Sequence, residues 1–196
     1  QVLETSVQQD APFLIYQESS MMARLTRDYC DETVDEVYID DKEFFDNFIG
    51  AKKLFLPHHD LKIEYHSDLT PIFSKHKIEK QVQTVYKRNI NLPSGGNIVI
   101  DSTEALVSID VNSARSTKGS DIEETALNTN IEAAVEILTQ LKLRDIGGLV
   151  VIDFIDMMSI NSQKNVMRKV AEYAKKDKAK IQFARISKFG LMELSR

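Results

Sequence analysis

The chain has a single cysteine, Cys30, so no internal disulfide can form and no cysteine pair is present to hold structural zinc. It also lacks an apolar run of the roughly 18 residues that span a bilayer. No basic start followed by an apolar segment marks a signal peptide. The sequence therefore favours a protein of the reducing cytoplasm, with Cys30 as an inert, partly buried thiol.

Several motifs of common enzyme classes are missing too. Gly95-Gly96 is not followed by a helix and a lysine, which excludes a phosphate-binding P-loop there, and no dinucleotide fingerprint is present. No serine has the context of a nucleophile elbow. His58-His59-Asp60 contains three possible metal ligands, but adjacent residues rarely converge on one ion. The pattern favours a solvated turn.

An excess of acidic residues gives the chain a net charge of −5, which at first opposes a polyanionic partner. Its distribution weakens that objection. Residues 1–70 carry 15 acidic and 6 basic groups, whereas residues 71–120 have a net charge of +3 and residues 121–196 a net charge of +1. A nucleic acid can therefore lie against the later two thirds of the chain.

Hydrophobic periodicity predicts an α/β protein with a change of character near residue 86. Before it, we expect helices over 21–30, 42–54 and 72–86 and strands over 36–40 and 61–65. After it, Pro93-Ser94-Gly95-Gly96 predicts a hairpin over 89–101. We then expect strands over 105–109, 149–152 and 181–186, the second buried on both faces, and helices over 120–141 and 162–174. Ser120 and Glu123 form a capping box at the start of the first of these helices.

Two aspartates each follow a hydrophobic strand of this second region. Asp110 ends the strand before the long helix and Asp153 ends the strand after it, 43 residues later. If the two strands are neighbours, both carboxylates emerge at the same sheet edge, where α/β proteins bind ligands. Such a pair repels unless a cation lies between the carboxylates, and Mg²⁺ prefers oxygen ligands of this kind. Aspartates that cap turns or helices can have the same spacing, and the pattern alone does not distinguish such caps from a metal site.

Other polar residues lie near these aspartates in the sequence. Asn112 can share the face of Asp110 and donate to a phosphate or a carboxylate, or it can be a turn residue. Asp156 can join the site or cap a helix, and Arg115 and Lys118 can contact phosphate or remain solvated loop charges. Phe183 and Phe189, near Arg185 and Lys188, can clamp a single strand or belong to the core and its rim.

The motifs around these residues closely resemble the bacterial ribonuclease E/G family. The resemblance is dense from about residue 86 onward and looser but continuous before it. It rests on Leu-Pro-Ser-Gly-Gly-Asn-Ile-Val-Ile-Asp (92–101), Ile-Asp-Val-Asn-Ser-Ala-Arg (109–115), Asp-Ile-Glu-Glu-Thr-Ala (121–126), Leu-Arg-Asp-Ile-Gly-Gly-Leu-Val-Val-Ile-Asp-Phe-Ile-Asp-Met (143–157) and Ile-Ser-Lys-Phe-Gly-Leu-Met-Glu-Leu-Ser-Arg (186–196).

This resemblance implies an architecture and a chemistry. Residues 86–196 would form a DNase I-like catalytic subdomain, residues 24–85 part of an RNase H-like subdomain, and residues 1–23 the tail of a 5′-end-sensing region. The family's metal-binding aspartates fall on Asp110 and Asp153, and its assisting asparagine on Asn112. The implied reaction is Mg²⁺-dependent cleavage of single-stranded A/U-rich RNA to 5′-phosphate and 3′-hydroxyl ends, in mRNA decay and in rRNA and tRNA processing.

The family's other parts set the limits of what the resemblance implies. The chain begins at Gln1 and ends at Ser195-Arg196, which suggests an excised piece without the family's S1 domain and zinc-binding link. We expect a homo-oligomer for the full-length protein, and degradosome or membrane contacts are not encoded in this segment. Two other hypotheses stay open: a catalytically weak fragment acting as an interaction or dimerisation module, and an unrelated Mg²⁺ phosphohydrolase.

Overall fold

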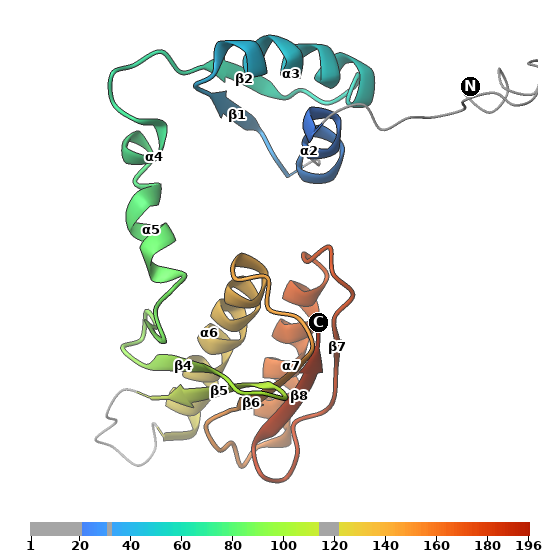
Figure 1. The fold of residues 1–196 in the computed structure, drawn as a ribbon. Coiled ribbons are helices and arrows are strands. Elements are labelled where there is room, and N and C mark those ends of the chain that lie inside the picture. Colours follow the sequence, from blue (N-terminus) through green and yellow to red (C-terminus); the bar gives the residue numbers. More distant parts are fainter. Residues whose placement is uncertain (1–20, 31–32, 114–121) are drawn as a thin grey trace, which may run out of the picture. The chain divides into compact units, whose positions relative to one another are not determined.

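The computed structural model describes residues 21–30, 33–113 and 122–196 (Figure 1). The chain divides into two compact units, residues 1–78 and residues 79–196, which we describe separately. The division falls inside a short helix, a few residues before the change of character near residue 86. Every helix over the described ranges is too short or too polar to cross a membrane.

The first unit packs two helices against a pair of strands. Helix α2 (Met21–Tyr29) precedes β1 (Glu36–Ile39), helix α3 (Lys42–Phe55) and β2 (Lys62–Tyr65), and the two strands pair in parallel. Asp41 caps α3, because its carboxylate accepts a hydrogen bond from the Phe44 N–H at 2.6 Å. These elements match the predicted ones within a few residues. The buried core consists of Met22, Cys30, Ile39, Phe48 and Leu61.

The single helix predicted over 72–86 is wrong. The structure has two short helices, α4 (Ile72–Lys75) and α5 (Ile78–Thr84), separated at Lys77, whose φ of 56° lies in the left-handed region. Neither helix has a buried residue. Since packing stabilises most short helices in proteins, a segment without buried side chains lacks the contacts that would stabilise one continuous helix.

The second unit is a mixed sheet with helices on one face (Figure 1). The strand order is β3-β4-β5-β6-β8-β7, in which only β5 and β6 pair in parallel. Helices α6 (Ile122–Leu143) and α7 (Ile160–Ala174) pack against each other, and α6 makes the crossover between the parallel strands. The strands are β3 (Asn89–Asn91), β4 (Asn97–Ser102), β5 (Val107–Asn112), β6 (Leu149–Asp153), β7 (Gln182–Phe183) and β8 (Leu191–Ser195).

Alternating burial gives this sheet two different faces. The residues facing the helices are buried and apolar; they include Ile98 and Ile100 on β4, Ile109 and Val111 on β5, Val150 and Ile152 on β6, and Met192 and Leu194 on β8. Their neighbours along each strand point to the opposite face and are half-buried or exposed. We call this the open face of the sheet.

The expectation that the strand over 149–152 is buried on both faces is wrong. Leu149 is 45% exposed and Asp153 is exposed, whereas Val150 and Ile152 are buried. Within the described residues of the second unit, helices cover only one face of the sheet, so a continuous apolar run does not need two covered faces here. The hairpin predicted over 89–101 is confirmed, with β3 and β4 pairing antiparallel.

Candidate active site

Asp110 and Asp153 are direct neighbours across the parallel pair of strands. They are Cα partners in the β5–β6 register, and both side chains are exposed on the open face. Adjacent strands lie about 4.8 Å apart, so the two carboxylates extend from neighbouring points of one surface. Asp153 is the last residue of β6, as expected. Asp110 is not the end of its strand, because β5 continues to Asn112.

Asn112 lies on the same face, two residues after Asp110. Its side-chain Nδ2 donates a hydrogen bond to Asp110 Oδ2 at 2.7 Å. The residue belongs to strand β5 rather than to a turn. Because the amide occupies one side of this carboxylate, the other lone pairs of Asp110 are left for a different partner.

The electrostatics of the pair favour a positive charge beside it. Burial raises the pKa of Asp153 above its ordinary value, and the negative charges of Asp110 and Asp156 raise it further. The folded chain thus disfavours the ionised form of Asp153 when nothing compensates its charge. A proton or a cation shared by the carboxylates relieves that repulsion. This arrangement can hold a divalent ion that keeps most of its water ligands.

Asp156 reaches the vicinity of the pair from the loop after β6. A Cβ atom at Gly190 would lie 3.3 Å from Asp156 Oδ1 and 3.8 Å from Asp153 Oδ1, so both carboxylates border this glycine. Gly190 has a φ of 80° and precedes β8. Across the described ranges, no three His, Cys, Asp or Glu side chains have the geometry of a metal site. A closed protein cage for an ion is therefore absent from that part of the chain, whereas two carboxylates suit a largely hydrated one.

One buried polar residue that the sequence reasoning missed fixes the loop after Asp153. Asn130 lies in α6 with no exposed surface. Its Nδ2 donates to the Ile155 carbonyl oxygen at 2.8 Å, and its Oδ1 accepts from the Ile155 N–H at 3.0 Å. A polar residue within the apolar stripe from Ala126 to Ile137 was the available signal. Asn130 therefore holds the backbone two residues beyond Asp153.

The far end of the same loop is held by Glu123. Its carboxylate accepts hydrogen bonds from the N–H groups of Met158 at 3.0 Å and Ser159 at 3.1 Å, at the start of α7. These backbone bonds, with a further one from the Ser162 side chain, lower the pKa of Glu123. Glu123 was predicted as part of a capping box with Ser120, which lies outside the described residues. In the structure Glu123 holds the two backbone N–H groups just before α7, whose own N-cap is Ser159.

We expect Asn130→Ala to destabilise the chain by about 2–4 kcal/mol, because it leaves the N–H and carbonyl of the half-buried Ile155 without these partners. Urea unfolding would measure the change. Thr139→Ala is the matched control: this exposed hydroxyl only bonds back to the Val135 carbonyl of the same helix. A loss at Asn130 no greater than that at Thr139 would contradict the role given to Asn130.

The other predicted site residues separate into three groups. Arg115 and Lys118 lie outside the described residues. Phe183 packs half-buried against the core of the second unit, as expected for a rim residue. Phe189, by contrast, is 70% exposed, and the Lys188 Nζ lies 5.0 Å from its ring centroid. Phe189 directly precedes Gly190, the glycine that the Asp153 and Asp156 carboxylates border.

The His58-His59-Asp60 segment belongs to the first unit and follows α3. No metal cluster includes these residues in the described structure. They border a hollow together with Cys30 and Leu56.

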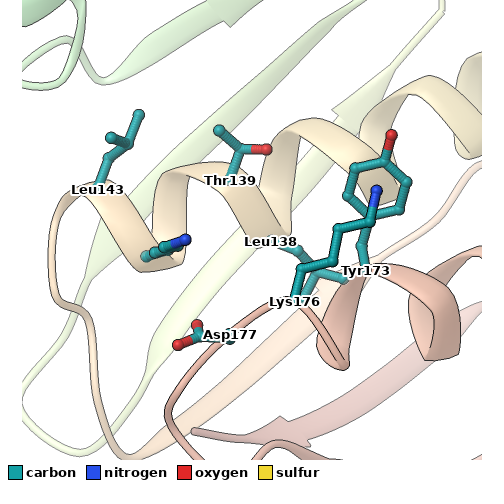
Figure 2. Close-up of a pocket in the computed structure, with 7 residues that line it drawn as sticks. Leu138, Thr139, Leu143, Tyr173, Lys176 and Asp177 are labelled. Atoms are coloured by element: carbon teal, nitrogen blue, oxygen red, sulfur yellow. The ribbon is translucent and has the colours of Figure 1, made fainter. Parts of the chain in front are cut away.

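A separate hollow of about 260 Å³ lies between the ends of α6 and α7 (Figure 2). Leu138, Thr139, Lys142 and Leu143 line it from α6, and Tyr173, Lys176 and Asp177 from the end of α7 and the residues that follow. The Lys176 Nζ lies 4.0 Å from the Tyr173 ring centroid. This hollow is at the carboxyl end of α6, whereas Asn130, near the amino end, contacts the loop after Asp153. The hollow is thus distinct from the aspartate pair.

Comparison with protein families matches the whole chain, residues 1–196, to the Ribonuclease E/G family. The chain belongs to the ribonuclease E/G family. It is similar to Ribonuclease E of Haemophilus influenzae, with 49% identity over 195 residues that cover all of this chain and 21% of that protein. Ribonuclease E of Escherichia coli K12 is 50% identical over 189 residues, which cover 95% of this chain and 18% of that protein.

A more distant relative carries the other name of the family. Ribonuclease G of Salmonella typhimurium is 31% identical over 195 residues, covering all of this chain and 40% of that protein. The chain thus spans about a fifth of the Ribonuclease E relatives and two fifths of the Ribonuclease G relative. Membership of the ribonuclease E/G family agrees with the resemblance seen in the sequence and removes the hypothesis of an unrelated phosphohydrolase.

Proposed function

We propose that this chain is the catalytic core of a Mg²⁺-dependent endoribonuclease in which Asp110 and Asp153 hold the metal. The substrate is single-stranded A/U-rich RNA, and the products carry 5′-phosphate and 3′-hydroxyl ends. The cellular role is mRNA decay and the processing of rRNA and tRNA precursors in the cytoplasm. The proposal rests on one observation above all: the two aspartates are register partners on neighbouring parallel strands, exposed on one face.

The residues present fit a magnesium ion. Two carboxylates supply hard oxygen ligands, and burial together with the charges of Asp110 and Asp156 raises the pKa of Asp153, which favours a cation beside it. When bound, Mg²⁺ lowers the pKa of a coordinated water and neutralises charge on the phosphoryl oxygens. Asn112 keeps Asp110 oriented through its 2.7 Å hydrogen bond. Asn130 holds the Ile155 backbone, and with it the loop that follows Asp153.

The substrate must approach the open face, since helices cover the other one. The Asp110 and Asp153 side chains lie on the open face, in a unit whose charge is more positive than that of residues 1–70. We propose that Arg115 and Lys118, three and six residues after Asn112 at the end of β5, contact the RNA phosphates. Such contacts position the strand without reading its sequence.

The architecture implied by the family is part of the same proposal. Residues 86–196 form the DNase I-like subdomain, residues 24–85 part of the RNase H-like subdomain, and residues 1–23 the tail of the 5′-sensor region. The mixed sheet with helices on one face supports a catalytic α/β layer over residues 86–196. The full-length protein is proposed to be a homo-oligomer.

Cleavage of an unstructured A/U-rich RNA labelled at its 3′ end would test the function. We expect cutting in Mg²⁺, none in EDTA, and products that a 5′-phosphate-dependent exonuclease degrades. Cleavage that persists in EDTA, or products with 5′-hydroxyl ends, would contradict the proposal. Mg²⁺ binding without cleavage would favour the alternative, a catalytically weak fragment. This alternative needs a test because the chain spans only about a fifth of its Ribonuclease E relatives.

A further inference from the structure

The turn before β8 carries an exposed aromatic ring on a hydrogen-bonded backbone. The Gly190 N–H donates to the Ser187 carbonyl at 3.1 Å, and the Ser187 N–H donates to the Leu191 carbonyl at 2.8 Å. The Phe189 N–H also donates to Ser187 Oγ at 3.2 Å. These bonds close a tight turn over residues 187–190, with Phe189 at its tip. The backbone that carries this ring is therefore well defined although the ring itself is 70% exposed.

The same turn is attached to the aspartate site. The Phe154 N–H, immediately after Asp153, donates to the Gly190 carbonyl at 3.2 Å. Gly190 borders the Oδ1 atoms of Asp153 and Asp156, and Leu191 is the register partner of Asp153 on β8. Phe189 is thus one residue away from backbone that touches the carboxylates. A side chain there lies within reach of a strand whose phosphate is held at the site.

The chemistry of the tip suits a nucleotide. An exposed phenylalanine offers a π-face to any unpaired base, and such stacking tolerates different sequences. The Lys188 Nζ lies 5.0 Å from the Phe189 ring centroid, so a cation accompanies the aromatic surface. A base stacked on the ring and a phosphate beside the ammonium can belong to the same nucleotide. Most exposed apolar residues need no explanation, but this one lies in a hydrogen-bonded turn, directly before the glycine that borders two acidic groups.

We infer that Phe189 is a stacking platform for one unpaired base of the RNA, next to the phosphate held at Asp110 and Asp153, with Lys188 facing the backbone of the same strand. The inference rests on the proposed function for the location of the phosphate. It adds a subsite that binds a base through its π-face. Phe189 therefore contributes to binding of the strand and not to the chemical step.

Binding of a fluorescently labelled A/U-rich RNA to the whole chain, measured by anisotropy with Ca²⁺ in place of Mg²⁺, would test this. We expect Phe189→Leu to weaken binding by about tenfold, within the range that base–aromatic stacking supplies. Phe189→Trp should restore it, because indole also stacks. Tyr86→Leu is the matched control. Tyr86 is an aromatic residue of the same unit and is 85% exposed. It borders Ser102, which lies at the opposite end of β4 from Asn97.

Strands with a single abasic nucleotide at successive positions distinguish stacking from a merely structural effect. One abasic position should weaken binding to the unsubstituted chain by about tenfold and binding to Phe189→Leu by less than about twofold. Equal penalties in both proteins, or unchanged binding by Phe189→Leu, would overturn the inference. Failure of the proposed function has a different signature, because full Mg²⁺-dependent cleavage by Asp153→Asn would sink that function without altering these binding results.

Discussion

Asp153→Asn is expected to lower Mg²⁺-dependent RNA cleavage by about a thousandfold, and Asp110→Asn by a similar factor. A bound metal contributes several kcal/mol of charge stabilisation to the transition state. Since each 1.36 kcal/mol is a factor of ten in rate, the loss of one of two metal ligands removes most of the activity. The rate of cleavage of a fluorogenic single-stranded RNA at saturating Mg²⁺ would measure the effect.

Two controls make this loss specific to the site. Glu193→Gln removes another exposed carboxylate of the open face, on β8 opposite Val151, and should leave the rate within about twofold. Circular dichroism and thermal unfolding should show that each aspartate variant keeps its fold, because both side chains are exposed on the surface of the sheet. More than about a tenth of the activity remaining in Asp153→Asn would contradict the assignment of the metal ligands.

Arg196→Ala is expected to have the largest effect on stability, about 3–5 kcal/mol, because it leaves the charge of Asp177 buried without its partner. The Arg196 Nε donates to Asp177 Oδ2 at 2.7 Å, and Nη2 donates to Asp177 Oδ1 at 3.3 Å. Nη1 also donates to the Ile146 carbonyl at 3.1 Å. The two side chains are only 9% and 6% exposed, so water cannot replace these bonds. Urea unfolding of both proteins gives the difference.

An exposed ion pair of the same unit provides the comparison. Arg88 and Asp101 also form a bidentate pair, but their side chains are 66% and 42% exposed. Arg88→Ala should therefore cost no more than about 1 kcal/mol. Equal losses for Arg88→Ala and Arg196→Ala would show that burial does not control the strength of these pairs.

The same buried pair sets a dependence of stability on pH. The hydrogen bonds from Arg196 are the largest cause that lowers the pKa of Asp177 below its ordinary value of 3.8. A lowered pKa in the folded state means that the pair stabilises the fold fully above about 3.8 and loses this contribution as the pH falls through the lowered value. Unfolding midpoints below pH 4 should fall more steeply in the unsubstituted chain than in Asp177→Asn. Parallel curves would contradict this.

The pairing of the two aspartates was predictable from sequence because chain connectivity constrains it. A strand, a helix and a second strand form a parallel pair when the crossover packs on one face, and this brings Asp110 beside Asp153. Sequence alone did not separate this arrangement from two aspartates that cap turns. The observed register and the shared face are what bring the two side chains together.

Features that depend on tertiary packing were not predictable in the same way. A polar residue within an apolar helical stripe marks Asn130 in the sequence, but only the folded chain shows that its partner is the Ile155 backbone. Gly190 lies 37 residues after Asp153, and only the antiparallel pairing of β6 with β8 brings the two together. The strand after the long helix looked buried on both faces because an apolar run does not show which face is covered. Local patterns therefore predicted most of the elements but not β8, and contacts between distant segments define the site.

Binding of Mg²⁺ is the most direct test that Asp110 and Asp153 hold a metal, and thermal unfolding with and without the ion measures it independently of catalysis. At ten times its dissociation constant, Mg²⁺ should stabilise the unsubstituted chain by about 1.4 kcal/mol, relative to Na⁺ at matched ionic strength. Asp153→Asn should lose this shift and, in EDTA, unfold at a higher temperature than the unsubstituted chain. The pKa of Asp153 is raised in the folded state, so its ionised form opposes folding at neutral pH. An equal Mg²⁺ shift in both proteins would contradict the metal site.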